Sequence, residues 1–199
     1  MSALQKSKVT WKDVPTRTIA AGGVRFAYRE LGADNPGTPL VCLIHLAAVL
    51  DNWDPRVIDG LATKHRVDMA RGFLTGQDPK QFLFFTRTPE GIRAGKEFLQ
   101  RLNERSADRD KKITVAALQA QLKALRRWGG KRPADLSKVQ HPVLIANGDS
   151  DRMVPSKNTY DLAQRLPNSE LIIYPDSGHG AVFQFHVDFV GKALEFLSR

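Results

Sequence analysis

The sequence predicts an α/β fold whose sheet is mostly parallel. Residues 141–147 (His-Pro-Val-Leu-Ile-Ala-Asn) are predicted as a buried strand, and residues 170–174 (Glu-Leu-Ile-Ile-Tyr) as a second strand. Each strand is followed by a helical pattern, at 156–166 and at 183–197. Strand and helix alternating at this spacing favour a parallel sheet that helices cover.

The N-terminal part of the chain adds an antiparallel hairpin. Val24, Phe26 and Tyr28 alternate with other residues in the pattern of a strand with one buried face. The glycine pair at 22–23 can adopt the positive φ angles of a tight turn. We therefore expect residues 17–21 to pair with this strand.

A buried strand and a helix come next. Residues 39–46 are apolar on both faces, as in a central parallel strand covered by helices. A helix is expected from Asp54-Pro55 to about Ala62, with proline in its first turn. Another strand begins at His65 and stops at Val67.

The middle of the chain is expected to be helical. Thr88 can cap a helix that begins at Pro89, and Thr114 can cap a second helix that ends at Gly129-Gly130. The inward side of the first helix would consist of Ile92, Phe98, Leu99 and Leu102. The second helix has an apolar stripe at helical spacing, made of Val115, Leu118, Leu122, Leu125 and Trp128. Residues 104–112 are expected to form a charged, solvated connection.

The composition is that of one globular domain. The lone cysteine, Cys42, cannot form an internal disulfide. No apolar run approaches the ~18–20 residues of a membrane span, and the first 13 residues do not have the pattern of a secretory signal. We expect a cytoplasmic protein with no membrane partner, no metal and no cofactor.

The charge is strongly basic, with 30 Lys and Arg against 21 Asp and Glu, or a formal +9. Basic residues are concentrated at Lys123–Arg132. We interpret them as a solvated helix face, because no zinc-finger spacing, aromatic RNA-binding strand or basic-zipper repeat accompanies them. No nucleic-acid partner is expected.

Two polar loops follow the last two predicted strands. The first reads Gly148-Asp-Ser-Asp-Arg-Met-Val-Pro155 and the second reads Pro175-Asp-Ser-Gly-His-Gly180. In their order and spacing they resemble the last third of the α/β-hydrolase family. The resemblance implies that Asp151 is the acid and His179 the general base of a catalytic triad. Such a carboxylate fixes the imidazole tautomer, so that the other ring nitrogen can take a hydroxyl proton.

A third segment, Leu43-Ile-His-Leu-Ala-Ala-Val-Leu-Asp-Asn-Trp53, also resembles this family. In the family, a strand that ends in His-Gly introduces the oxyanion-hole loop. Here Leu46 stands where that glycine is expected, and the resemblance implies the backbone N–H of Ala47 as the donor. His45 is interpreted as a residue that braces the loop.

The nucleophile of such a triad is missing from the sequence. The family presents it on a G-x-S-x-G turn, but the single Gly-x-Ser here is Gly148-Asp149-Ser150, inside the acid loop. Cys42 is expected inside a strand. The resemblance implies that a block of roughly 80–90 residues is absent between Val67 and Asp68. It also implies an incomplete hydrolase sheet, formed by 1–67 and 133–199 of one interrupted domain, with 68–132 as a helical cap.

We therefore expect a family member whose ancestral activity was hydrolysis of an ester or similar acyl substrate, and which is inactive as it stands. Two alternatives are a non-catalytic binding or interaction protein on the reduced fold and an enzyme completed by a partner chain. A small-molecule ligand remains possible. Self-association could occur through strand edges left without a neighbour. Residues 82–85 fit an apolar substrate site and core packing equally well.

Overall fold

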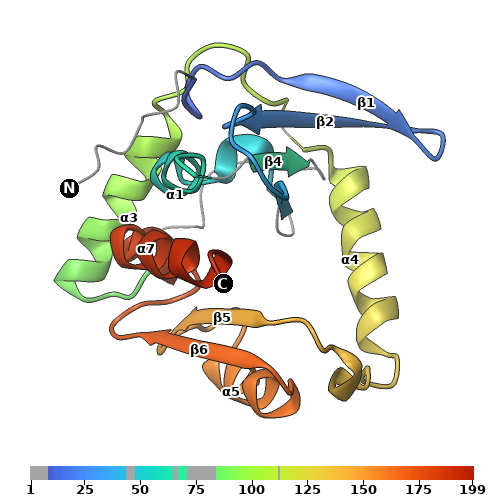
Figure 1. Cartoon of the computed structure of the whole chain (residues 1–199), viewed down its shortest axis with the longest axis vertical. Helices are drawn as coiled ribbons and strands as arrows, with labels where there is room; N and C mark the ends of the chain where they lie inside the picture. Colours follow the sequence, from blue (N-terminus) through green and yellow to red (C-terminus); the bar gives the residue numbers. More distant parts are fainter. Residues whose placement is uncertain (1–8, 44–47, 65–66, 71–83, 112) are drawn as a thin grey trace. The chain divides into compact units, whose positions relative to one another are not determined.

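A computed structural model describes five stretches of the chain, residues 9–43, 48–64, 67–70, 84–111 and 113–199 (Figure 1). The chain divides into two compact units. The first unit contains Met1–Gln77 and Arg101–Gly130, and the second contains Asp78–Gln100 and Lys131–Arg199. Among the described residues, no helix is long and apolar enough to cross a membrane.

The first unit contains a four-stranded sheet in the order β1-β2-β4-β3. Its strands are β1 (Arg17–Ala21), β2 (Val24–Leu31), β3 (Leu40–Leu43) and β4 (Val67–Ala70). The predicted hairpin of β1 and β2 is confirmed, with φ angles of 56° at Gly22 and 76° at Gly23. β4 pairs antiparallel with β2 and parallel with β3.

Two expectations about this sheet were wrong. The strand expected to stop at Val67 continues to Ala70, because its backbone fills the position between β2 and β3 and pairs with both. β3 is parallel, as expected, but among the described strands it is the terminal one of its sheet rather than a covered central one. Its Val41 and Leu43 side chains are 60% and 71% exposed.

The buried face of β2 was also assigned to the wrong residues. Val24 and Phe26 are exposed, whereas Arg29 and Leu31, on the opposite face of the strand, are buried. Alternation along a strand places these two sets on different faces. The face that carries Arg29 is buried because the carboxylates of Asp51 and Asp110 pair with this guanidinium.

Helices of the first unit begin where the sequence indicated. Asp54 caps α1 (Pro55–Leu61) by accepting a hydrogen bond from the Arg56 backbone N–H at 3.0 Å. Thr114 caps α4 (Val115–Gly129), accepting from the Ala117 N–H at 3.4 Å. α4 has no buried residue, so its apolar stripe does not contribute to the core. A short 3-10 helix, η1 (Leu50–Asn52), precedes α1.

A buried ion network connects the hairpin with residues 104–112. Arg29 pairs with Asp51 at 2.8 Å, and their side chains are 0% and 3% exposed. The Asp110 N–H donates to Asp51 Oδ2 at 2.8 Å, and the Asp110 carboxylate accepts from the Leu50 N–H at 2.6 Å. Arg105 is also buried. The expectation of a solvated connection holds for residues 104, 106–109 and 111, which are exposed, but it was wrong for Arg105 and for the Asp110 side chain, which find partners far away in the sequence.

The N-terminal segment is attached to the same unit by two hydrogen bonds of Trp11, which is fully buried. Its carbonyl accepts from Arg105 Nη1 at 3.0 Å, and its N–H donates to the Asp59 carboxylate at 2.6 Å. Burial raises the pKa of Asp59 to about 6, against the opposing effect of that hydrogen bond. The guanidinium of Arg105 thus joins the two sequence segments that form the unit.

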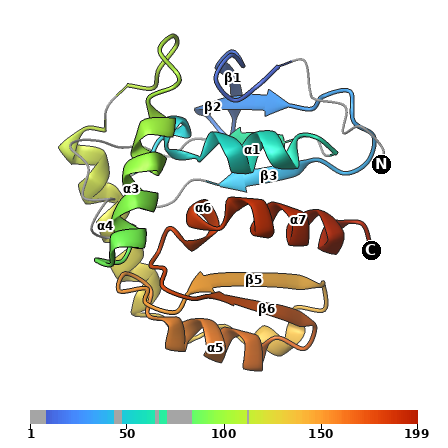
Figure 2. The same ribbon diagram turned by 90° about the vertical axis from the view of Figure 1, so that its left-hand side faces the viewer.

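The second unit contains a two-stranded parallel sheet of β5 (Val143–Gly148) and β6 (Ser169–Tyr174). α5 (Ser156–Arg165) packs on one face, and α6 (Ala181–Gln184) and α7 (His186–Leu197) lie on the other (Figure 2). The predicted strands are confirmed. The closing helix is broken at Phe185, whose ring stacks on Tyr174 with centroids 4.8 Å apart. A short 3-10 helix, η2 (Leu136–Lys138), precedes β5.

The helix α3 (Pro89–Leu102) begins in the second unit, and Thr88 caps it as expected, accepting from the Gly91 N–H at 3.0 Å. Its Phe98 is buried and stacks on Phe183, with centroids 4.9 Å apart. Ile92 was expected to face inward but is exposed. The buried side instead passes through Gly91, Ala94 and Phe98.

We predict that Asp51→Ala lowers the free energy of unfolding of the first unit by about 3–5 kcal/mol, because it removes the nearer of the two carboxylates, Asp51 at 2.8 Å and Asp110 at 3.7 Å, that pair with the buried Arg29 guanidinium. Urea unfolding followed by circular dichroism measures this. Arg93→Ala is the matched control, since its ion pairs with Glu90 and Glu97 are exposed and should be worth at most about 1 kcal/mol. Equal losses in the two variants would contradict the assignment.

Candidate active site

The two polar loops meet at one edge of the β5–β6 sheet. Parallel pairing aligns Gly148 at the end of β5 with Tyr174 at the end of β6. The chain continues from these positions into the acid loop, residues 148–155, and the histidine loop, residues 175–180. Carboxyl ends of parallel strands are where ligands and catalytic groups collect in open α/β sheets.

The structure brings Asp151 and His179 together. Asp151 Oδ2 lies 2.9 Å from His179 Nδ1, and the two side chains are 1% and 25% exposed. The other carboxylate oxygen, Oδ1, accepts from the backbone N–H groups of Met153 and Val154 at 2.8 and 3.0 Å. The carboxylate is therefore held by its own loop and favours a proton on Nδ1. This tautomer leaves Nε2 as the basic nitrogen.

Close approach of the two loops depends on glycine. A Cβ at Gly148 would lie 2.1 Å from the Ser177 carbonyl oxygen. The Ser150 N–H donates to that same oxygen at 2.9 Å, which joins the loops directly. At Gly178, a Cβ would lie 2.7 Å from the carbonyl oxygen of Phe84. A side chain at residue 148 would therefore push the two loops apart, and a side chain at residue 178 would push the histidine loop away from Phe84.

Two residues that the sequence did not assign to the site brace the histidine loop. Asp149 accepts from the N–H groups of Asp176 and Ser177 at 3.2 and 3.4 Å. Asp176 adopts a φ of 46° and accepts from Thr88 Oγ1 at 2.7 Å. Thr88 was recognised as a helix cap alone, and its second role has no local signal, because its partner lies 88 residues away.

Aromatic side chains border the histidine on one side. The Phe84 ring meets the His179 imidazole edge to face, with centroids 5.2 Å apart. Phe84 and Phe85 are both buried, and Phe85 packs on Phe98 at 5.5 Å. These contacts favour core packing for the described half of the 82–85 run, while Phe82 and Leu83 lie outside the described residues.

The serines nearest to the pair in sequence direct their hydroxyl groups elsewhere. Ser150 Oγ donates to Asp149 Oδ1 at 2.9 Å, and Ser177 Oγ, fully buried, donates to the Tyr174 carbonyl at 3.0 Å. Cys42 lies in β3 of the other unit and is half-buried. The proposed oxyanion residues Leu46 and Ala47, together with His45, lie outside the described residues.

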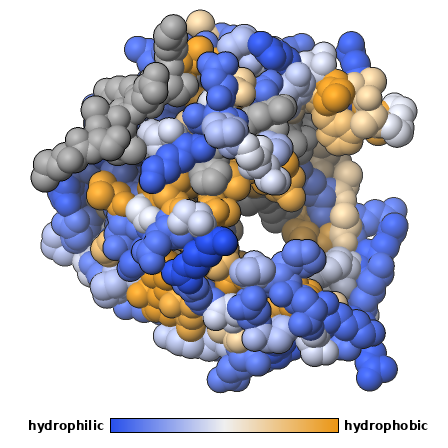
Figure 3. Space-filling model, viewed as in Figure 1, coloured by the Kyte–Doolittle hydropathy of each residue, from blue (hydrophilic) through white to orange (hydrophobic). Residues whose placement is uncertain are grey.

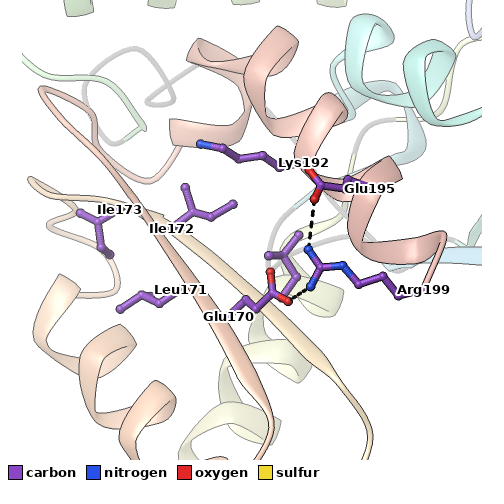
Figure 4. A pocket seen from close by; sticks show the side chains of 8 residues that line it. Glu170, Leu171, Ile172, Ile173, Lys192, Glu195 and Arg199 are labelled. Atoms are coloured by element: carbon purple, nitrogen blue, oxygen red, sulfur yellow. Dashed lines mark hydrogen bonds and ion pairs between the residues drawn. The ribbon is translucent and has the colours of Figure 1, made fainter.

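A groove of about 470 Å³ lies elsewhere on the second unit, between β6 and the end of α7 (Figure 4). Its lining combines charged side chains with apolar ones such as Ile172. Arg199 at its rim pairs with Glu170 and Glu195. Lys192 also lines the groove, so two basic and two acidic side chains balance there and the groove does not offer a separate charged site. Within the described stretches, no group of three His, Cys, Asp or Glu could hold a metal ion.

A carboxylate hydrogen-bonded to a histidine at the carboxyl ends of neighbouring parallel strands has the arrangement of the acid and the general base in a catalytic triad. Residues 68–185 match the family model of the alpha/beta hydrolase fold. The chain therefore belongs to the α/β-hydrolase family. It superposes on an alpha/beta hydrolase fold protein from Chitinophaga pinensis with a TM-score of 0.88 at 26% identity, covering 95% of this chain and 99% of that one.

Curated relatives include enzymes of different chemistry. The chain is 31% identical to a 2-hydroxy-6-oxo-6-(2'-aminophenyl)hexa-2,4-dienoic acid hydrolase of Metapseudomonas resinovorans, over 49% of this chain and 34% of that protein. It is 38% identical to the non-heme chloroperoxidase CPO-A1 of Kitasatospora aureofaciens, over 33% of this chain and 25% of that protein. The matches thus span about a third or less of these relatives' lengths.

We predict that Asp151→Asn shifts the neutral imidazole of His179 from the Nδ1–H to the Nε2–H tautomer, because an amide NH₂ would donate where the carboxylate accepted. Long-range nitrogen–proton NMR correlation in mildly alkaline buffer measures the tautomer ratio. Asp161→Asn, on the exposed side of α5, is the control. An unchanged ratio in the Asp151 variant would contradict the hydrogen-bond direction inferred here.

Proposed function

We propose that this chain is a hydrolase-family protein whose ancestral activity was triad-dependent hydrolysis of an ester or similar acyl bond, and that the chain alone is inactive. The proposal rests on one observation: the acid–histidine pair is present, whereas the sequence has no G-x-S-x-G turn to present a nucleophile. The hydroxyl groups of Ser150 and Ser177, bonded to Asp149 and Tyr174, support it.

The expected loss of catalytic turnover is large. Removal of the nucleophile from a triad lowers turnover by about a millionfold, and the remaining groups retain only binding and electrostatic stabilisation. His179 would then have the role of a proton acceptor without an attacking hydroxyl. The relatives' names include a dienoic acid hydrolase and a chloroperoxidase. Enzymes with such different names agree with a small-molecule substrate, but they do not identify which substrate this chain's ancestor used.

The proposed domain organisation keeps 1–67 and 133–199 as parts of one hydrolase sheet and 68–132 as its helical cap, with an absent block of roughly 80–90 residues between Val67 and Asp68. β4 (Val67–Ala70) crosses that junction, so residues 68–70 lie in the sheet rather than in the proposed cap. A strand pairs through its backbone, so residues that follow a junction can occupy a position between two neighbours whatever their origin.

We predict that the purified chain shows no labelling by a fluorophosphonate probe and no turnover of a p-nitrophenyl ester panel above that of its His179→Ala variant. The reason is the missing activated hydroxyl. Ser150→Ala and Ser177→Ala serve as matched controls for the two serines beside the pair. Turnover that His179→Ala abolishes would reveal a nucleophile and overturn the proposal, and the serine variants would then identify it.

A non-catalytic interaction role is the second candidate, favoured by the outer edge of β5. The N–H groups of Val143 and Asp149 donate to the β6 side. Parallel-ladder alternation therefore directs the N–H and C=O groups of Leu144 and Ala146 away from β6. Within the described residues neither has a ladder partner on that side. Such an edge is a template for another strand.

We predict concentration-dependent self-association in multi-angle light scattering, which Ala146→Pro prevents because it removes an outward N–H without removing a β5–β6 hydrogen bond. Ala146→Val is the matched control, since it retains the N–H and suits a strand. A protein that stays monomeric at all concentrations, or a proline variant that associates like the control, would exclude this edge as the contact.

A further inference from the structure

The segment around α4 concentrates the positive charge of the chain. Between Asp110 and Asp135 the sequence has no acidic residue. It has seven basic ones: Lys111, Lys112, Lys123, Arg126, Arg127, Lys131 and Arg132. Most of the formal net charge of +9 therefore comes from this stretch. Hydrophilic residues follow α4 along the right-hand margin of Figure 3.

The same helix exposes large apolar side chains. Val115 and Trp128 are 71% and 74% exposed, and Leu122 and Leu125 are also exposed. At about 100° per residue these positions share one side of the helix, Lys123 and Arg127 project from the other side, and Arg126 flanks the apolar stripe. A helix on a globular surface ordinarily buries its apolar stripe, but α4 buries none of its residues.

An exposed apolar stripe with tryptophan, opposed by Lys and Arg without any carboxylate, is the composition of helices that lie in a membrane interface. We propose that α4 binds the surface of an anionic phospholipid bilayer. The stripe enters the boundary between head groups and acyl chains, and the cations meet the lipid phosphates. This proposal departs from the expectation of no membrane partner, which rested on the lack of a spanning segment; the lack of a spanning helix among the described residues does not bear on surface binding. The inference is independent of the proposed function.

Charge complementarity selects lipid over two other occupants of this surface. A second copy of α4 would bring its own run of cations against the first, without a carboxylate on either side to pair with them. A nucleic acid would satisfy the cations but leave the side chains of Leu122, Leu125 and Trp128 in water. An anionic bilayer alone provides negative charge and an apolar layer within one surface.

The test is co-sedimentation of the full chain with vesicles of phosphatidylcholine alone or of equal parts phosphatidylcholine and phosphatidylglycerol. We expect at least about tenfold stronger partitioning to the anionic vesicles, weakened by salt. Lys123→Glu, Arg126→Glu and Arg127→Glu together should lower it by about a hundredfold or more. Arg25→Glu, Arg87→Glu and Lys96→Glu change the net charge equally at other exposed positions and should lower it far less.

The apolar stripe has its own pair of variants. Trp128→Ala should weaken partitioning to anionic vesicles about tenfold. It should also abolish the blue shift of tryptophan fluorescence that vesicles induce. Val187→Ala, at an exposed site on α7, should do neither. Circular dichroism confirms that each variant is folded, and the blue shift of the unaltered chain provides a readout that needs no variant.

Several outcomes would overturn the proposal. One is equal binding to neutral and anionic vesicles, and another is charge reversal on α4 that has no more effect than the control reversals. A dimer in light scattering that Trp128→Ala dissociates, without vesicle binding, would assign the stripe to a second copy. Retention on duplex DNA that exceeds vesicle binding and is unaffected by Trp128→Ala would assign the cations to nucleic acid.

Discussion

The parallel pairing of β5 with β6 determines where the atoms of the acid–histidine pair can lie. Its register aligns Gly148 with Tyr174, so the chain leaves both strands at the same edge of the sheet. The acid loop and the histidine loop then come so close that the Ser177 carbonyl occupies the position where a side chain of residue 148 would be. Only within this spacing can Asp151 Oδ2 reach His179 Nδ1 at 2.9 Å.

Sequence patterns predicted those features of the fold that depend on neighbouring residues. The Gly22-Gly23 turn, the threonine caps at Thr88 and Thr114 and the strands β5 and β6 all have signals within a few positions. Turn geometry, capping and apolar runs are local, which is why they can be recognised without a structure. The order of strands in the sheet was not recognisable in this way.

Partners at long sequence separation explain the failures. Residues 104–112 look solvated by composition, but the Asp110 N–H bonds with Asp51, 59 residues away, and Arg105 bonds with Trp11, 94 residues away. The buried face of β2 is likewise the one that carries Arg29, because Arg29 pairs with the distant Asp51. A charged residue is buried when its partners supply enough hydrogen bonds and opposite charge, and no local pattern reports those partners.

The candidate site was predicted through its resemblance to a family, and only in part. Asp151 and His179 lie in recognisable loops, and the structure places them in contact. The supports of the histidine loop, Asp149 and Thr88, were not recognised as part of the site, because an aspartate in a turn and a threonine before a helix have common local explanations. A resemblance identifies conspicuous loops, whereas the hydrogen bonds that brace them require coordinates.

The contact between Asp151 and His179 can stabilise the fold whether or not the two residues take part in catalysis. The Asp151 side chain is 1% exposed, and its carboxylate accepts from Met153, Val154 and the imidazole of His179. A buried carboxylate that loses a partner destabilises the fold, so His179 has a structural role at this position whether or not a nucleophile faces it. The presence of the acid and the histidine is therefore weak evidence for turnover. The decisive group for catalysis is the hydroxyl that the imidazole would activate, and its absence from an elbow motif is visible in the sequence itself.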